Sequence, residues 1–287
     1  MKPTSIFPLL SGLAAFCLLT GNGLAQVGKS KGPASKIYLA ESEGDAQVQT
    51  GEKIYAGRQA TAFDAQGTVI ETKAKSHGAL VYSNGTGLFF DESTRLEITR
   101  FHQEPFRPDK NSNADAPVEP SVSASNVNVP HGFVGICTSQ LLSGSSMVYA
   151  TPFATITIRG GKVAIQSSPD ETVVDLLEGD LTVRGGGKDI GGTVLRPGER
   201  AVIKPGAPGE PPQVVIGPIP PEQLASVDSR VSIACNARKT VSFDTIGQTN
   251  EAGANGGDAN GEIVPKPTIP ASPPSNVVIS PDRLPGT

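Results

Sequence analysis

Few residues of this chain have the types and the spacing that catalysis or metal binding requires. The three histidines, His77, His102 and His131, lie far apart and lack the paired spacing typical of metal ligands. We interpret them as solvated loop residues and predict no metal and no cofactor. The glycine-rich run from Arg184 to Asp189 could suggest phosphate binding, but a phosphate-binding loop needs Ser or Thr where Asp189 stands. We predict that this run is a plain turn.

The sequence patterns of hydrolytic enzymes are weak in this chain. Serines are plentiful, but no G-x-S-x-G pattern, which presents the nucleophile of many hydrolases, occurs. Asp91-Glu92 and Asp170-Glu171 are acids of the kind that glycoside hydrolysis uses in pairs, yet both fall in predicted turns and are interpreted as solvated. We predict that the protein is not an enzyme, and a polysaccharide-acting enzyme is the least favoured alternative.

Arg159 is the charged residue that stands out. It follows a predicted strand with one buried face and precedes Gly160-Gly161. Two interpretations are open: a contact to a carboxylate or another anionic partner, or a structural pair with an acid in a neighbouring turn, such as Glu178. We favour the structural pair on the sequence alone.

The elements that would position Arg159 are β-strands. Apolar and polar residues alternate in TPFATITIRGGKVAI, which is the period of a pleated strand with one buried face. We predict two short strands, Ala154–Ile158 and Lys162–Ile165, with a sharp turn at the two glycines between them. A second hairpin is predicted at Asn84-Gly85, because both residue types tolerate positive φ.

The composition agrees with many short strands joined by turns. The 287 residues include 33 Gly and 25 Pro, only 5% are aromatic, and there is no Trp. We predict an all-β fold of short strands stacked in a solenoid-like or sandwich-like manner, with further turns at Glu178-Gly179-Asp180 and around Gly198. The formal net charge of −4 argues against a nucleic-acid partner, which would need a clustered basic patch.

The N-terminus and the cysteines indicate a compartment. Lys2, an apolar run and small residues before Ala25 predict a signal peptide over 1–25, cleaved after Ala25, and hence a secreted or periplasmic bacterial protein. No other segment predicts a transmembrane helix. Cleavage leaves Cys137 and Cys235, for which we predict one disulfide in an oxidising compartment. Two separate buried thiols are the alternative.

The predicted organisation after the signal peptide has four parts. They are a flexible lead over 26–36, a β domain over 37–205 with an inserted linker at 109–129, a Pro-rich segment with one short helix and a last strand over 206–246, and a disordered tail over 247–287. The helix is predicted at Glu222–Val231, because Leu224, Val227 and Val231 fall on one side, and the strand around Cys235.

Two blocks of the sequence resemble the FecR domain family. One runs from Ala79 to Ile98 and the other from Leu141 to Ile203, so the resemblance covers about Ile37 to Pro205. Gly161 departs from the family, which usually has Thr there. The residues that carry the resemblance are Asn84, Gly85, Thr151, Pro152, Arg159, Gly160, Glu178, Gly179, Gly198 and Glu199.

The resemblance implies a non-enzymatic, extracytoplasmic β domain. The best-known family members are inner-membrane regulators that receive a signal from an outer-membrane transporter and control a sigma factor, whereas this chain predicts no membrane helix. We therefore expect a domain that binds an envelope protein or polysaccharide, through strand edges or rows of side chains, in envelope signalling. A structural cell-envelope protein tethered by its Pro-rich tail is the alternative.

Overall fold

The computed structural model describes residues 35–56, 62–106, 114–186, 191–245 and 263–267. All of them belong to one unit of the chain, Lys31–Thr287. The predicted signal peptide with its cleavage site, most of the flexible lead and almost all of the disordered tail lie outside the described residues, as do 109–113 of the predicted linker. No helix within the described ranges combines the length and the apolar character that crossing a membrane requires.

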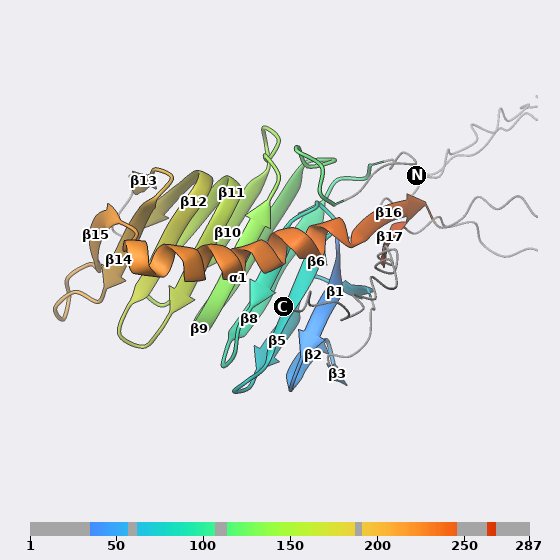
Figure 1. Ribbon diagram of the computed structural model, residues 1–287, viewed down its shortest axis with the longest axis horizontal. Helices are drawn as coiled ribbons and strands as arrows, with labels where there is room; N and C mark the ends of the chain where they lie inside the picture. Colours follow the sequence, from blue (N-terminus) through green and yellow to red (C-terminus); the bar gives the residue numbers. More distant parts are fainter. Residues whose placement is uncertain (1–34, 57–61, 107–113, 187–190, 246–262, 268–287) are drawn as a thin grey trace, which may run out of the picture. The chain divides into compact units, whose positions relative to one another are not determined.

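The prediction of an all-β fold with one helix is confirmed (Figure 1). The sheet is open rather than closed. The strands of the first half are β1 (Lys36–Glu43), β2 (Ala46–Thr50), β3 (Lys53–Ala56), β4 (Ala62–Asp64), β5 (Thr68–Thr72), β6 (His77–Tyr82), β7 (Gly87–Phe90), β8 (Arg95–Gln103) and β9 (Ser123–Thr138). Those of the second half are β10 (Ser146–Ala150), β11 (Thr155–Ser167), β12 (Thr172–Arg184), β13 (Thr193–Leu195), β14 (Glu199–Lys204), β15 (Gln213–Pro218), β16 (Val241–Thr245) and β17 (Ile263–Pro267).

Fifteen strands share one hydrogen-bonded network that is arranged in two layers. One layer has the order β4-β1-β6-β7-β9-β11-β12-β14-β15, and the other has the order β3-β2-β5-β8-β9-β10-β11-β12-β13. Three long strands, β9, β11 and β12, occur in both lists because each contributes one half to each layer. These shared strands are what join the layers into one domain.

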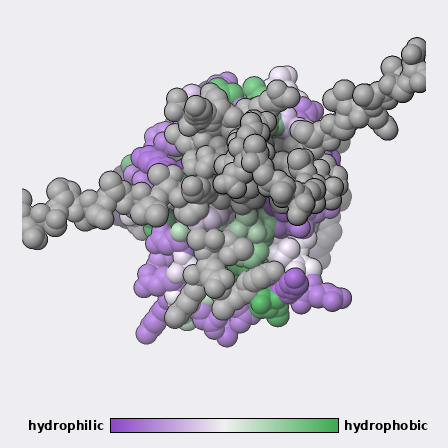
Figure 2. Space-filling view, turned by 90° about the vertical axis from the view of Figure 1, so that its right-hand side faces the viewer, coloured by the Kyte–Doolittle hydropathy of each residue, from purple (hydrophilic) through white to green (hydrophobic). Residues whose placement is uncertain are grey.

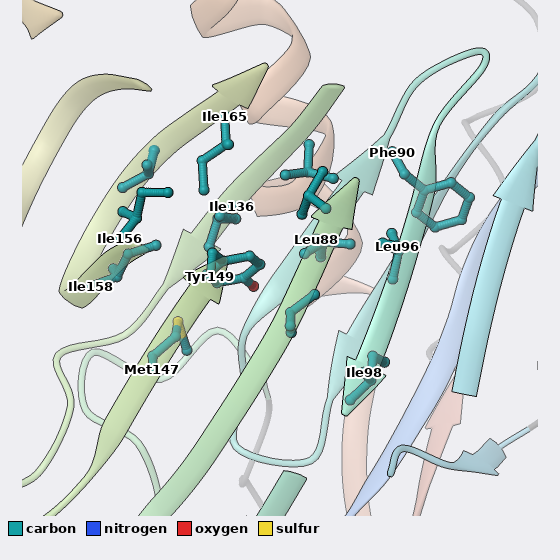
Figure 3. Packing of buried hydrophobic residues seen from close by; sticks show 14 of the residues in the cluster. Leu88, Phe90, Leu96, Ile98, Ile136, Met147, Tyr149, Ile156, Ile158 and Ile165 are labelled. Carbon is teal, nitrogen blue, oxygen red and sulfur yellow. The ribbon is translucent and has the colours of Figure 1, made fainter. Parts of the chain in front are cut away.

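The main hydrophobic core lies between the two layers. Alternate residues of the facing strands point into it, as the period of two along a strand requires. Figure 3 shows Leu88, Phe90, Ile136 and Ile165 from the first layer packing with side chains from the second layer, which include Leu96, Ile98, Met147, Tyr149, Ile156 and Ile158.

Two predicted turns are bends within continuous strands. The chain does not reverse at Gly160-Gly161 or at Glu178-Gly179-Asp180, where β11 and β12 run on side by side from one layer into the other. The register shifts between Ile158 and Gly160, and Gly161 has a φ of 110°. A positive φ at a bulge bends a strand while its hydrogen-bonded pairing with the neighbouring strand continues. A glycine in the sequence therefore does not by itself distinguish a bend from a turn. The turn prediction was wrong at both places.

The hairpin at Asn84-Gly85 forms as predicted. It joins β6 to β7, with Gly85 at a φ of 87° and the amide of Gly85 donating to the carbonyl oxygen of Tyr82. The turn that includes Gly198 also forms, between β13 and β14, where the φ of Gly198 is 87°. In both places the residue types that favour positive φ reverse the chain.

The predicted linker is in part a central strand. Ser123 to Val129 form the first half of β9, which pairs with β8 on one side and with β10 on the other. Val127 and Val129 are buried, and small polar residues alternate with them. Tertiary pairing supplies the buried surface that this stretch lacks by itself, so the linker prediction was wrong from Ser123 onward.

Helix α1 (Pro221–Lys239) is longer than predicted and includes Cys235, where we predicted a strand. It lies across the outer face of the first layer (Figure 1) and buries Val227, Val231 and Ala234 against that layer. Gly87 lets the helix approach closely, because a Cβ there would overlap the carbonyl oxygen of Ala234. Contact with the sheet extends the helix beyond the segment that sequence periodicity indicates.

Figure 2 views the side of the molecule at the right of Figure 1, where β1, β2 and β3 lie. Where described residues are visible, hydrophilic side chains occupy much of the rim, and a smaller hydrophobic area lies among them. Ile54 of the edge strand β3 is 64% exposed. An exposed apolar residue on an edge strand leaves that edge available for pairing with another chain.

Candidate functional site

A groove of about 680 Å³ lies beside Arg159, and we call it the Arg159 groove. One wall is Gln140–Ser146, which includes most of the loop between β9 and β10 and the first residue of β10. The other consists of Thr157–Gly161 of β11 and Gly179-Asp180 of β12, at the bend described above. The groove therefore exists because the two strands bend together at this level.

The loop that forms the first wall is held by a buried carboxylate. Glu119 is only 3% exposed, and its side chain accepts hydrogen bonds from the amide of Leu142 at 2.7 Å and from the hydroxyl of Ser145. The hydroxyl of Ser123 donates to the other carboxylate oxygen at 2.7 Å. Three donors on one buried carboxylate fix the loop conformation, since leaving any of them unpaired would be costly.

Arg159 is exposed, and its backbone carbonyl accepts a hydrogen bond from the amide of Leu141. Its guanidinium makes no hydrogen bond or ion pair within the described part of the chain. Glu178, the suggested structural partner, instead accepts from Lys162 Nζ at 2.7 Å. The structural pair with Glu178 was wrong, and the interpretation of Arg159 as a contact residue stays open.

The lining of the groove combines apolar residues, among them Leu141, Leu142 and Ile158, with polar residues and side chains of both charges. Arg159 and Asp180 are exposed on the strand side, and the exposed Ser143 and Ser146 contribute hydroxyls on the loop side. A guanidinium offers planar, paired donors that match a carboxylate, and the serines add adaptable donors and acceptors. The arrangement suits the binding of an anionic, hydrogen-bonding ligand in an open groove.

Several other residues of the resemblance have structural contacts. Thr151 Oγ1 accepts from the amide of Ala154 at 3.0 Å and from Thr172 Oγ1 at 2.8 Å, just before β11 begins. Asn84 is buried, and its side chain bonds the amide of Thr86 and the hydroxyl of Ser123.

Another residue of the resemblance, Glu199, has a structural contact at the turn before β14. Glu199 accepts from the backbone amide of Arg196 at 2.7 Å and closes that turn. Of the residues that carry the resemblance, Arg159, Gly160 and Gly179 line the Arg159 groove. Pro152 is exposed and does not line it.

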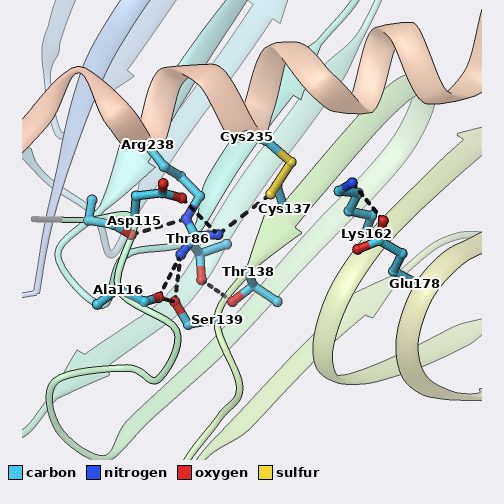
Figure 4. Close-up of a disulfide and its surroundings, with 11 residues drawn as sticks. Thr86, Asp115, Ala116, Cys137, Thr138, Ser139, Lys162, Glu178, Cys235 and Arg238 are labelled. Atoms are coloured by element: carbon cyan, nitrogen blue, oxygen red, sulfur yellow. Dashed lines mark hydrogen bonds and ion pairs between the residues drawn. A yellow bond between two sulfur atoms is a disulfide. The ribbon is translucent and has the colours of Figure 1, made fainter.

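The two cysteines are joined in the structure. The bond connects Cys137 on β9 with Cys235 on α1, 98 residues apart in sequence (Figure 4). Next to it, the buried Arg238 donates to the backbone oxygens of Ala114 and Ala116 and to Ser139 Oγ. Burial lowers the pKa of the Arg238 guanidinium, and the nearby Asp115 acts in the opposite direction.

A second contact region lies nearer the N-terminal end of α1. Arg200 on β14 makes two hydrogen bonds to the buried carboxylate of Asp175, at 2.5 and 2.8 Å, and its third nitrogen donates to Gln223 of the helix. The hydrogen bonds to Asp175 raise the pKa of Arg200. Arg230 lies over the ring of Phe133, 3.7 Å from its centre. These contacts attach the helix to the sheet.

Arg159 was recognised from the sequence as a candidate contact residue, whereas Glu119 was not. Glu119 falls in the stretch that we predicted to be a linker, and no local pattern separates a buried acid from a solvated one there. No group of three or more His, Cys, Asp or Glu side chains with metal-binding geometry occurs among the described residues.

Of the comparisons with known proteins, the one with solved structures found similar chains. No protein-family model matches the chain, and no curated protein matches it. Among solved structures, the fold is similar to two crystal structures of a candidate anti-sigma factor from Parabacteroides distasonis ATCC 8503. The TM-scores are 0.40 and 0.39, with 12% and 10% identity, over 55% of this chain and 62% and 63% of the other chains.

Proposed function

We propose that this chain is a non-catalytic, FecR-like binding domain that acts outside the cytoplasm in envelope signalling. Its Arg159 groove receives a carboxylate-bearing segment of a partner protein. The observation that carries the proposal is the exposed Arg159, whose guanidinium is unpaired within the described residues at the wall of a groove of about 680 Å³. An arginine without an internal partner is available for a charge-assisted contact.

The rigidity of the groove supports a recognition role. Glu119 fixes the loop wall, and the paired bend of β11 and β12 fixes the opposite wall. A binding surface that is already ordered loses less conformational entropy when a ligand binds. Among its lining residues the serines are accompanied by no histidine, cysteine or lysine, which favours binding over nucleophilic catalysis.

A structural envelope protein is the second candidate, and the sheet edges favour it. Ile54 on β3, Val194 on β13 and Val215 on β15 are 64%, 62% and 65% exposed, and all three strands lie at ends of the two layers. Exposed apolar residues on edge strands suit strand addition by another chain. In that case the layer edges, and not the Arg159 groove, would contact the partner.

Site-specific photo-crosslinking in intact cells tests the proposal. A photoreactive amino acid at Ser143 should capture one stoichiometric protein, and Arg159→Glu should lower the yield about tenfold or more, because hydrogen bonds to charged groups contribute about 1.5–3 kcal/mol. Arg196→Glu is the matched control, since Arg196 is also exposed but lies outside the groove.

Equal crosslinking yields in the Arg159→Glu and Arg196→Glu variants would contradict the role of Arg159. Capture from position 215 on β15 and not from position 143 would favour the structural alternative. A polysaccharide adduct at position 143 would contradict the protein partner.

A further inference from the structure

The disulfide lies at an open pocket of about 420 Å³ on the side of the molecule where α1 meets the sheet. Both sulfur-bearing residues line this pocket, together with Lys162, Arg238 and Lys239. The two cysteines differ in access, because Cys137 is only 5% exposed whereas Cys235 is half-buried. An incoming thiol therefore reaches Cys235 more readily.

Arg238 is held beside the less accessible sulfur. Its Nη1 donates toward Cys137 Sγ at 3.6 Å, while its other nitrogens are bound to Ala114, Ala116 and Ser139 (Figure 4). Asp115 is 3.7 Å from the same Nη1 and is partly exposed, so it offsets the positive charge only in part. A fixed guanidinium beside a sulfur favours the thiolate over the thiol.

We infer that the Cys137–Cys235 disulfide is a thiol-exchange site for a dithiol protein. The thiolate of the partner attacks Cys235 Sγ and forms a mixed disulfide, and the Cys137–Cys235 bond breaks with its electron pair on Cys137. Arg238 stabilises the Cys137 thiolate that leaves. The second thiol of the partner then attacks the mixed disulfide, which releases the Cys235 thiolate and leaves the partner oxidised.

Exchange at this site controls how α1 is attached. The disulfide and the Arg238 hydrogen bonds both join the C-terminal half of the helix to β9 and to the segment before it. The main core between the two layers contains no residue of α1. Reduction therefore loosens the helix while the layered core stays folded.

Trapping with a single-cysteine probe tests the direction of exchange. The probe is a reduced thioredoxin-class protein whose second active-site cysteine is replaced by serine, added to the oxidised full chain. Peptide mass spectrometry should locate the mixed disulfide at Cys235. An adduct at Cys137, or no adduct while the protein is folded, overturns the inference.

Two substitutions test the role of Arg238 through the rate of reduction by dithiothreitol. Arg238→Met should slow reduction by about threefold or more, because a less stabilised thiolate is a poorer leaving group. Asp115→Asn should speed reduction by roughly twofold, because the counter-charge is removed. If Arg238→Met does not fold, the Asp115→Asn variant alone tests the inference. An unchanged or slower rate of disulfide reduction in that variant overturns it.

Hydrogen exchange before and after reduction tests the consequence. Protection should fall in α1 and persist in Ile136, Ile156 and Ile165. If amide protection is lost in α1 and in the core at the same time, the proposal that the disulfide controls the attachment of α1 is overturned.

Discussion

Gly161 on β11 faces Gly179 on β12 across the bend that the two strands share. A Cβ on Gly161 would overlap the carbonyl oxygen of Glu178, and a Cβ on Gly179 would overlap that of Gly160. Both residues have positive φ, at 110° and 97°. The pair therefore brings two backbones into contact at the point where both strands change layers, and this contact also forms one wall of the Arg159 groove.

Gly161→Ala should destabilise the domain strongly. The backbone must move to accommodate the methyl group, and the residue is also held at positive φ, so we expect a loss of about 3 kcal/mol or more in the free energy of unfolding. Gly198→Ala is the control, because Gly198 has a φ of 87° but nothing within 4 Å of its Cβ position. It should cost only about 1–2 kcal/mol. Urea unfolding that gives equal losses would contradict the close-contact explanation.

Asp175→Asn should show the value of the buried ion pair with Arg200. The side chains are 5% and 14% exposed, so the substitution leaves a largely buried guanidinium without its counter-charge. We expect a loss of about 3 kcal/mol in unfolding free energy. Lys162→Gln, in the more exposed pair with Glu178, should cost no more than about 1 kcal/mol. Thermal and urea unfolding of the two variants measure the difference, and equal losses would show that burial is not the cause.

Tyr82→Phe should stabilise the protein at neutral pH. The Tyr82 hydroxyl is buried and has no hydrogen-bond partner among the described residues, so its removal recovers about 1–3 kcal/mol of desolvation cost. Burial also raises the pKa of Tyr82 above its ordinary value of 10.0. Above pH 10 the unfolded chain loses this proton while the folded chain keeps it, so stability falls as pH rises. The variant should lose less stability between pH 9 and pH 11, and an identical decline would contradict this account.

Glu119→Gln should loosen the loop wall of the Arg159 groove without unfolding the domain. The substitution removes the charge from the acceptor of three hydrogen bonds and puts an amide in its place. Amide exchange of residues 140–146 should accelerate about tenfold or more, as expected for the loss of a charge-assisted bond. Exchange at Ile165, which lies past the bend on β11 and in the main core, should not change. Unchanged loop exchange would show that Glu119 does not hold the loop.

The sequence was a good guide where the signal is local. Alternation identified most strands, Asn84-Gly85 identified a hairpin, and Gly198 lies in a turn that forms. The pairing of Cys137 with Cys235 was one of only two arrangements available once Cys17 was assigned to the signal peptide. These features depend on residues close together, or on a very small number of alternatives.

Other features depend on partners that are distant in sequence. Gly160-Gly161 and Gly179 look like turns in isolation, but each strand continues because the other strand bends beside it. Ser123 to Val129 have few apolar residues of their own and become a strand between β8 and β10. Glu119 accepts hydrogen bonds from Leu142 and Ser145, which lie 23 and 26 residues further along the chain.

By itself, the sequence determined the all-β class, the hairpin at Asn84-Gly85 and the selection of Arg159 as a candidate contact residue, because each follows from period, backbone freedom or residue type. Only the tertiary structure decided that β11 and β12 cross between layers and that Cys235 lies on a helix. It also decided that Glu178 forms its ion pair with Lys162, so that Arg159 is unpaired within the described chain. The reason is physical: bends, ion pairs and close helix contacts are settled by groups that meet only when the chain is folded.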